Sequence, residues 1–264
     1  MTTSSHTDET FNIGIFLYQG VEELDFCGPF EVLKAASYTR SEKGQNPVWQ
    51  VFTVAEEPGL LKTSGEMLIQ PHFTFHNHLH IDLLVVPGGL ASSQVKKPAV
   101  LEWLRKVTSQ AQLNTSVCTG AFLLGAVGLL DGHTVTTHWS ALDELARQYP
   151  GARVEREVRW VDEGRLVTAA GISAGMDMSL HLVERLAGRE LAEEVAHYME
   201  YRWQEQYLLR ERVTFRPCYA GLVKLQVESS RSLKLSRPIT ISMTARTWAR
   251  CSWCPKAKLH GGEQ

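Results

Sequence analysis

The chain has 264 residues and a formal net charge of −2, with 44% hydrophobic and 21% charged residues. Its length suits one large α/β domain or two small ones, and its composition is that of an ordinary globular protein. No stretch reaches the roughly 18 apolar residues of a membrane span, and residues 1–9 lack the features of a signal peptide. We therefore expect a cytoplasmic protein with no membrane partner.

The five cysteines are an odd number, which argues against a disulfide framework. Free thiols fit a reducing compartment, in agreement with the expected location.

Charge is distributed unevenly along the chain. Residues 213–264 contain nine basic and two acidic residues, a net charge of +7, whereas residues 1–212 carry −9. The same C-terminal segment contains ten Ser/Thr and shows no sustained helical or strand period. We predict three regions: a disordered N-terminus (1–10), a catalytic domain (11–209) and a basic, poorly ordered or non-homologous tail (210–264). We expect no nucleic-acid partner, although the basic tail leaves that alternative open.

Strand and helix signals alternate up to about residue 206, which predicts an α/β fold with a mostly parallel sheet covered by helices on both faces. The apolar run 81–86 is typical of a strand buried on both faces. A hairpin is expected around Ser64 and Gly65, and a turn at 162–164. The expected strands are 12–18, 48–55, 81–86, 114–117, 135–139, 153–161 and 166–169. The expected helices are 28–37, 98–112, 119–130, 141–149, 171–187 and 190–206.

Residues 115–121 (Thr-Ser-Val-Cys-Thr-Gly-Ala) predict a buried strand that ends at Cys118 and turns directly into a helix. Such a turn presents one side chain at the carboxyl edge of a sheet, beside a helix N-terminus. An electropositive position of this kind favours the thiolate, the reactive form of cysteine.

Asp25 is the second candidate, in a tight loop that we expect between the first strand and a helix opening at Gly28-Pro29. The carboxyl ends of parallel strands converge on one crevice, so Asp25 and Cys118 are expected to meet there. Covalent catalysis with acid/base assistance needs at least a nucleophile and an acid.

Four motifs resemble those of the ThiJ/PfpI superfamily, whose fold is similar to class I glutamine amidotransferases, and within it the isonitrile hydratase branch. The motifs are Leu-Asp-Phe-Cys-Gly-Pro at 24–29, Ser-Val-Cys-Thr-Gly at 116–120, Thr-Thr-His-Trp at 136–139 and Ala-Gly-Ile-Ser-Ala-Gly at 170–175, together with Pro-Gly-Gly at 87–89. The resemblance covers roughly residues 11–205.

The resemblance implies a flavodoxin-like three-layer sandwich, usually a homodimer, that needs no cofactor or metal. It also implies hydration of a small-molecule isonitrile to an N-substituted formamide. In that reading Cys118 is the nucleophile, Asp25 the acid/base partner and Thr119 a functional threonine. Gly88, Gly89 and the Thr119 N–H would form an oxyanion-hole-type cradle.

A mechanism follows from these roles. The Cys118 thiolate attacks the isonitrile carbon and gives a thioimidate, while Asp25 donates a proton and later activates water. Donation near neutral pH requires that burial raise the pKa of Asp25.

Two positions separate the chain from other branches that it resembles. Proteolytic relatives carry His directly after the cysteine, where this chain has Thr119, which argues against a Cys–His dyad. Chaperone and glyoxalase-like relatives usually carry Glu at the position of Asp25.

Structural alternatives stay open for each candidate. Cys118 can be a packed thiol, Asp25 and Thr119 can serve the start of a helix, and Gly88-Gly89 can be a plain turn. His138 either lines the site or packs in the core beside Trp139. Cys27 is expected to be a packing residue.

Two further clusters were considered for metal binding, and we expect neither to bind metal. The histidines at 72, 76, 78 and 80 fit no standard ligand spacing, and the Cys251/Cys254 pair lacks a second pair.

Three classes of function compete: an enzyme, the sensor domain of an AraC-type transcription regulator lacking its DNA-binding part, and a redox-sensing stress protein with Cys118 as the sensor. Such regulators carry two helix-turn-helix units in about 100 further residues. Residues 213–264 show no paired amphipathic helices, which favours the enzyme.

Overall fold

The structure is a computed structural model that describes residues 10–45 and 47–204. The tail predicted at 210–264 lies outside these residues, as does the predicted disordered N-terminus apart from Thr10, which opens the first strand.

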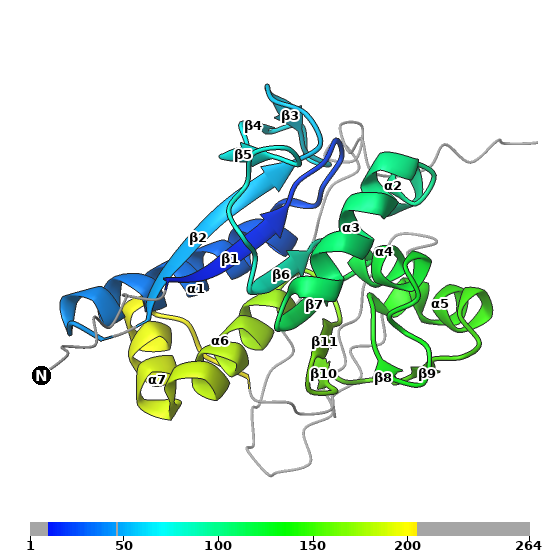
Figure 1. Cartoon of the computed structure of the whole chain (residues 1–264). Coiled ribbons are helices and arrows are strands. Elements are labelled where there is room, and N and C mark those ends of the chain that lie inside the picture. Colours follow the sequence, from blue (N-terminus) through cyan, green and yellow to red (C-terminus); the bar gives the residue numbers. More distant parts are fainter. Residues whose placement is uncertain (1–9, 46, 205–264) are drawn as a thin grey trace, which may run out of the picture. The chain divides into compact units, whose positions relative to one another are not determined.

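A seven-stranded sheet forms the centre of the fold, in the order β10-β11-β7-β6-β1-β2-β5 (Figure 1). Its neighbouring strands are parallel except for β10, which runs antiparallel to β11. The mostly parallel α/β sheet predicted from the sequence is therefore confirmed. Its strands are β1 (Thr10–Phe16), β2 (Val48–Ala55), β5 (Phe73–Thr74), β6 (Leu83–Val86), β7 (Leu113–Val117), β10 (Trp160–Asp162) and β11 (Leu166–Ala169).

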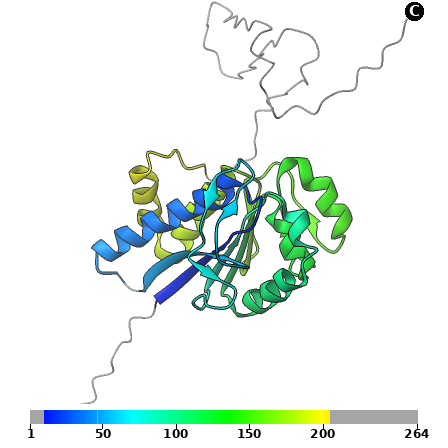
Figure 2. The ribbon, with the colours of Figure 1, turned by 90° about the horizontal axis from the view of Figure 1, so that it is seen from above.

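Helices cover both faces of this sheet, as Figure 2 shows in the view from above. On one face α1, α6 and α7 pack against one another, and on the other face α2 and α3 contact α4. The helices are α1 (Glu23–Glu42), α2 (Ala91–Gln94), α3 (Pro98–Gln110), α4 (Gly120–Ala126), α5 (Leu142–Gln148), α6 (Ala174–Ala187) and α7 (Arg189–Tyr198). A 3₁₀ turn, η1 (Trp139–Ala141), precedes α5.

The central strands are buried on both faces. Each residue of Leu83–Val86 has no exposed surface, as the continuous apolar run predicted. The register pairs Val86 with Ser116, and Val117 with Ala169. The segments that follow β6, β7 and β11 therefore leave the sheet at the same edge.

Helix α1 differs from the prediction. It begins at Glu23 rather than at Gly28, so Asp25 lies in the first turn of a helix and not in a loop. Pro29 lies inside this helix, where it removes only the N–H that would bond to the carbonyl of Asp25. The later N–H groups are unaffected, and the helix continues to Glu42.

Several other predicted elements are shorter in the structure, among them the helix predicted at 190–206, which ends at Tyr198 as α7. Helix α4 ends at Ala126 because Gly128 adopts a left-handed conformation (φ 83°) and its N–H caps the helix on Gly125. The strand predicted at 153–161 is interrupted at Glu157, which has a positive φ. Its first part, β9 (Arg153–Val154), pairs in parallel with β8 (Thr134–Val135), and the strand predicted at 135–139 ends at Val135.

Two small predicted features are confirmed. The strands β3 (Leu61–Lys62) and β4 (Leu68–Ile69) form the hairpin expected around Ser64 and Gly65. The turn expected at 162–164 joins β10 to β11, the antiparallel pair at one edge of the sheet.

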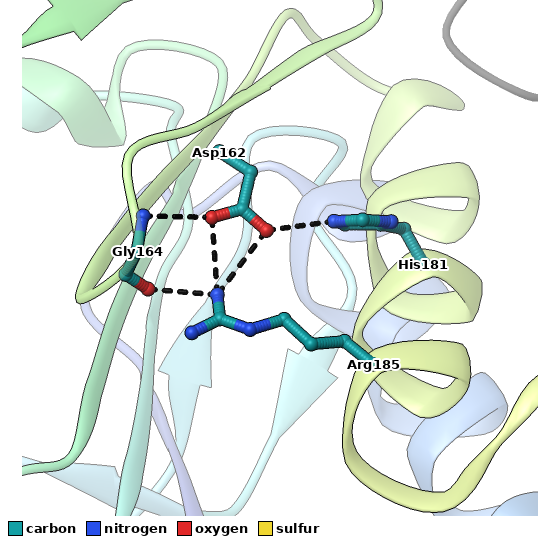
Figure 3. Close-up of polar contacts among 4 residues, drawn as sticks. All are labelled: Asp162, Gly164, His181 and Arg185. Atoms are coloured by element: carbon teal, nitrogen blue, oxygen red, sulfur yellow. Dashed lines mark hydrogen bonds and ion pairs between the residues drawn. The ribbon is translucent and has the colours of Figure 1, made fainter.

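A cluster of polar side chains attaches this β10–β11 turn to helix α6 (Figure 3). The Asp162 carboxylate lies 2.7 Å from Nε2 of His181 and 3.0 Å from Nη1 of Arg185, and it accepts the N–H of Gly164. Burial opposes its ionisation, but the His181 and Gly164 hydrogen bonds and the Arg185 charge together lower the pKa of Asp162. The ionised carboxylate therefore stabilises the contact between the edge of the sheet and α6.

We expect Asp162→Asn to lower the free energy of unfolding by about 1–2 kcal/mol at pH 7, because it leaves His181 and Arg185 without their anion. Since the folded-state pKa of Asp162 is lowered, this stabilisation is present above the ordinary carboxyl pKa and is lost as the pH falls below it. Urea unfolding of both proteins between pH 3 and pH 7 measures the difference. The control is Asp143→Asn, whose carboxylate is 91% exposed, and it should change the stability by less than about 0.5 kcal/mol.

Candidate active site

Cys118 occupies a sharp turn between β7 and α4. Its backbone is left-handed, with φ at 57°, a conformation that costs a residue other than glycine about 1–2 kcal/mol. Hydrogen bonds hold this turn: the Cys118 N–H donates to Ala169 O (3.1 Å), and the Thr137 hydroxyl donates to Cys118 O (2.6 Å). The side chain is 7% exposed. The predicted turn from strand to cysteine to helix is confirmed.

Gly120 lets α4 begin this close to the sheet. A Cβ atom at this position would lie 2.0 Å from the carbonyl oxygen of Val86, at the end of the neighbouring strand. No side chain fits in that space, so glycine is required for the turn.

Asp25 is completely buried in the first turn of α1. Its two oxygens accept backbone N–H groups from separate loops, Oδ2 from Gly88 (3.0 Å) and Oδ1 from Ile172 (3.0 Å). The Cys118 thiol lies close enough to this carboxyl group for each to shift the pKa of the other. The structure thus brings together the two residues that the sequence singled out.

The pKa of Asp25 is raised from its ordinary value of 3.8 to about 6. Burial is the largest cause and the charge of Glu22 adds to it, while the two N–H bonds and the neighbouring Cys118 thiol act in the opposite direction. This agrees with the expectation that burial brings the acid close to neutral pH.

The pKa of Cys118 is raised, in contrast to the predicted preference for the thiolate. Burial is the largest cause, and the negative charge of Asp25 adds to it. The N–H and the side chain of Thr119 favour the thiolate, but α4 has only seven residues and these contributions do not offset burial and the charge of Asp25. At neutral pH the pair therefore consists of a thiol beside a carboxylate.

Gly88, Gly89 and Thr119 form one hydrogen-bonded group beside this pair. The N–H of Gly88 binds Asp25, and the N–H of Gly89 donates to Oγ1 of Thr119 (3.1 Å), whose hydroxyl lies 3.2 Å from Gly89 O. Both glycine N–H groups thus have partners within the protein, so they position Asp25 and Thr119. That the N–H groups of Gly88 and Gly89 bind an oxyanion stays a prediction, and it requires each of them to leave its present partner for the substrate.

No side chain fits at position 88. A Cβ on Gly88 would lie 2.7 Å from the nitrogen and Oγ1 of Thr119 and 2.8 Å from Oδ2 of Asp25. The glycine is therefore required by close approach, rather than by a plain turn.

His138 lies partly buried beside the loop that carries Ile172. A Cβ on Gly171 would lie 2.6 Å from its ring, and its Nδ1 is 2.8 Å from Oγ of Ser140. Burial lowers the pKa of His138, although the charge of Glu22 opposes this shift. The ring is therefore neutral at neutral pH, and a role in binding stays a prediction.

Sequence reasoning gave no role to Ile172 and Tyr18. Ile172 adopts a left-handed conformation (φ 53°), rare for a β-branched residue, which directs its N–H to Asp25. The buried Tyr18 hydroxyl donates to the carbonyls of Pro87 (2.9 Å) and Gly88 (2.7 Å). The motif at 170–175 was a signal for Ile172, whereas nothing in the sequence marked Tyr18.

A buried ion pair supports the Ile172 loop. Asp177, which has no exposed surface, accepts Nε of Arg159 (2.6 Å), the Tyr201 hydroxyl (3.0 Å) and the N–H of Gln204 (2.9 Å). Arg159 also donates to Oγ of Ser173 (3.1 Å). These bonds attach the start of α6, and with it the loop that binds Asp25, to the C-terminal end of the described chain.

The histidines at 72, 78 and 80 have other partners. Nδ1 of His72 lies 2.7 Å from Oγ1 of Thr53, Nε2 of His78 accepts from Trp103, and His80 lies near Asp82. Within residues 10–45 and 47–204, no three His, Cys, Asp or Glu side chains are arranged to hold a metal ion. Cys251 and Cys254 lie outside the described residues.

Residues 10–45 and 47–204 contain no helix that is long and apolar enough to cross a membrane.

We expect the free energy of unfolding of the wild type, relative to Asp25→Asn, to fall by about 2 kcal/mol between pH 4 and pH 7. The folded-state pKa of Asp25 is raised, so its contribution is complete below the unfolded value and is lost as the pH rises through about 6. Denaturant titrations of both proteins across this range measure the difference. A difference between the wild type and Asp25→Asn that stays constant with pH would contradict the assignment.

Comparison with known proteins places these features in a family. The family model described as "DJ-1/PfpI family" matches residues 12–185. An isonitrile hydratase of Pseudomonas putida is 34% identical over 190 residues, which cover 72% of this chain and 78% of that protein. The HTH-type transcriptional regulator CdhR of Pseudomonas aeruginosa is 36% identical over 180 residues, which cover 68% of this chain and only 52% of the regulator.

Solved structures agree with this assignment. A ThiJ/PfpI family protein from Pseudomonas syringae superposes with a TM-score of 0.66 and 26% identity, covering 78% of this chain and 84% of that one. Drosophila melanogaster DJ-1beta shares the fold, with a TM-score of 0.62 and 23% identity over 74% of this chain and all of its own. The chain therefore belongs to the DJ-1/PfpI family.

Proposed function

We propose that the protein hydrates a small isonitrile, R–NC, to the formamide R–NH–CHO, with Cys118 as nucleophile and Asp25 as acid and base. The observation that carries this proposal is the placement of a buried carboxyl group of pKa about 6 beside the thiol at the end of β7. The 34% identity to an isonitrile hydratase supports the choice of substrate class.

The first step forms a covalent intermediate. The Asp25 carboxylate takes the thiol proton of Cys118 and passes it to the isonitrile carbon, and the sulfur bonds to the same carbon. The product is a thioimidate, R–N=CH–S–Cys. The raised pKa of Asp25 suits both halves of this transfer, because the group both accepts and releases a proton near neutral pH.

The second step releases the product. Asp25, again a carboxylate, takes a proton from water as the water oxygen adds to the thioimidate carbon. The nitrogen takes up one proton, the C–S bond breaks, and the sulfur leaves with the other proton. The sum is R–NC plus H₂O to R–NH–CHO, with Cys118 and Asp25 restored, and it uses no cofactor or metal.

The neighbouring residues support this chemistry in the proposal. The N–H of Thr119 stabilises negative charge on the sulfur, and its hydroxyl holds the Gly88–Gly89 loop against Asp25. His138 is proposed to contact the substrate as a neutral ring. The homodimer and the cytoplasmic location implied by the sequence stay predictions.

We expect the purified protein to convert cyclohexyl isocyanide and an aryl isocyanide to their formamides. Cys118→Ala should lower kcat/KM by roughly 10³-fold or more, and Asp25→Asn by roughly 10²- to 10⁴-fold, because each removes a group that acts in both steps. Mass spectrometry of the formamide is the measurement. Cys27→Ala is the matched control, since Cys27 lies partly buried on the same helix as Asp25, and it should retain activity.

A folded wild-type protein that forms no formamide would overturn the hydratase proposal. It would favour the second candidate, a ligand-sensing domain, which the 36% identity to the regulator supports. Calorimetric binding of an isonitrile without turnover would be the signature of that function.

We expect kcat/KM for a neutral isonitrile to rise about tenfold per pH unit below pH 6 and to level off near pH 7. Asp25 must be ionised to accept the thiol proton, so its pKa of about 6 sets the pH below which kcat/KM falls. A rate that instead falls as the pH rises through 6 would mean that protonated Asp25 is the active form. The apparent pKa belongs to the Asp25–Cys118 pair, because the two groups titrate together.

A further inference from the structure

Tyr18 lies against the loop that binds Asp25. It follows β1, and β1 pairs in parallel with β6, so the segments that leave these two strands lie side by side at the edge of the sheet. Tyr18 is 4% exposed, and its ring packs against that of Phe16 at a centroid distance of 5.1 Å. The hydroxyl is therefore held in one place, in contact with the segment 87–89 that follows β6.

The Tyr18 hydroxyl lies within hydrogen-bond distance of two successive carbonyl oxygens, those of Pro87 (2.9 Å) and Gly88 (2.7 Å). A phenol has one proton, which the two oxygens share. Burial is the largest cause that raises the pKa of Tyr18 well above its ordinary value, and the charge of Asp25 is the next. The hydroxyl is therefore protonated, and a donor, at every pH at which the protein is expected to act.

The two carbonyls belong to the two peptide groups whose N–H groups face the site. The peptide between Pro87 and Gly88 donates its N–H to Oδ2 of Asp25 (3.0 Å). The next peptide, which ends at Gly89, donates its N–H to Oγ1 of Thr119 (3.1 Å). In a planar trans peptide the C=O and the N–H point in opposite directions. A donor that fixes the carbonyl oxygen therefore also fixes the direction of the N–H on the other side.

We propose that Tyr18 is a positioning residue, whose hydroxyl holds both peptides so that their N–H groups point at Asp25 and Thr119. The inference rests on the proposed function for the reaction that these groups serve. In that reaction the N–H of Gly88 stabilises the carboxylate that takes the thiol proton. Hydrogen bonds in a chain also polarise one another, so the bond from Tyr18 strengthens the N–H groups as donors.

The variant Tyr18→Phe removes the hydroxyl and keeps the ring. Gly88 O then retains the N–H of Glu22 as a donor (3.0 Å), so we expect the loss to act chiefly on the carbonyl of Pro87. The N–H of that peptide binds Asp25 and lowers its pKa. A less firmly directed N–H stabilises the carboxylate less, so the pKa of Asp25 should rise above its value of about 6 in the wild type.

NMR measures this titration without any turnover. Aspartate enriched in the NMR-active carbon isotope at its side-chain carboxyl gives one signal for each residue, and Asp25→Asn assigns the signal of Asp25. In Tyr18→Phe the midpoint of this signal should move up by roughly 0.5 pH unit or more, because hydrogen bonds to a charged group are strong. Glu22 and Cys118, the other titratable groups that act on Asp25, are the same in both proteins.

Tyr149→Phe is the matched control. It removes the same atom and the same kind of bond, which runs from the Tyr149 hydroxyl to the carbonyl of Phe122 on α4 (2.9 Å), and it leaves the segment 87–89 intact. The midpoint of Asp25 should stay unchanged. If Tyr18→Phe does not fold, a single 3-fluorotyrosine at position 18 keeps the hydroxyl and makes it a stronger donor, and the midpoint should then move down.

An Asp25 midpoint that stays in place in Tyr18→Phe, with only a loss of stability, would overturn the inference and leave Tyr18 a purely structural residue. An equal movement of the midpoint in Tyr149→Phe would also overturn it. If only the fluorinated protein folds, a midpoint equal to that of the wild type would do the same.

Turnover of cyclohexyl isocyanide tests the consequence for the reaction. Relative to the wild type, kcat/KM of Tyr18→Phe should be lowered roughly threefold more at pH 5 than at pH 8, because a midpoint half a pH unit higher leaves about one third as much ionised Asp25 at the lower pH. Hydration with an unchanged pH profile in Tyr18→Phe would overturn the positioning role and leave the function. A midpoint that moves in a protein that forms no formamide would overturn the function and leave the positioning of Asp25 established.

Discussion

The burial of one carboxyl group, that of Asp25, sets the requirements for the rest of the site. A carboxylate without exposed surface needs hydrogen-bond donors, and here two backbone N–H groups provide them, with the Cys118 thiol beside the carboxylate. Each of these neighbours of Asp25 constrains the backbone where it lies. Gly88 has no room for a side chain, Ile172 adopts a left-handed conformation, and Cys118 adopts another at the end of its strand. The unusual backbone positions of the site therefore have a common cause.

The acid and the thiol cannot be understood separately. A cysteine at the start of a helix is ordinarily expected to be acidic, but the adjacent carboxylate and the lack of solvent reverse that tendency here. What the arrangement provides is one proton that resides on the Cys118 sulfur, beside a carboxylate that can take it up as the substrate reacts. Such a pair can deliver the proton to a substrate and recover it, which neither group can do alone.

The sequence was sufficient for the fold class, the turn at Cys118 and the meeting of Cys118 with Asp25, because these follow from strand patterns and from the shared edge of a parallel sheet. Predictions from the sequence failed where tertiary contacts override local sequence patterns. Pro29 suggested the start of a helix, yet α1 begins six residues earlier, where Glu23 binds the β3–β4 hairpin. The pKa of Cys118 depends on burial, and the role of Ile172 depends on a contact with a residue 147 positions away, and neither can be read from a local pattern.

The separation of the donors along the chain has a consequence for how the thiol gains its properties. Asp25 is 63 residues from Gly88 and 147 from Ile172, and the three come together only when strands from both halves of the sheet are in register. Before these strands are in register, Cys118 has no acid held beside it. The raised pKa of the Cys118 thiol is thus a property of the folded protein, so the rate at which Cys118 is labelled reports whether the chain has folded.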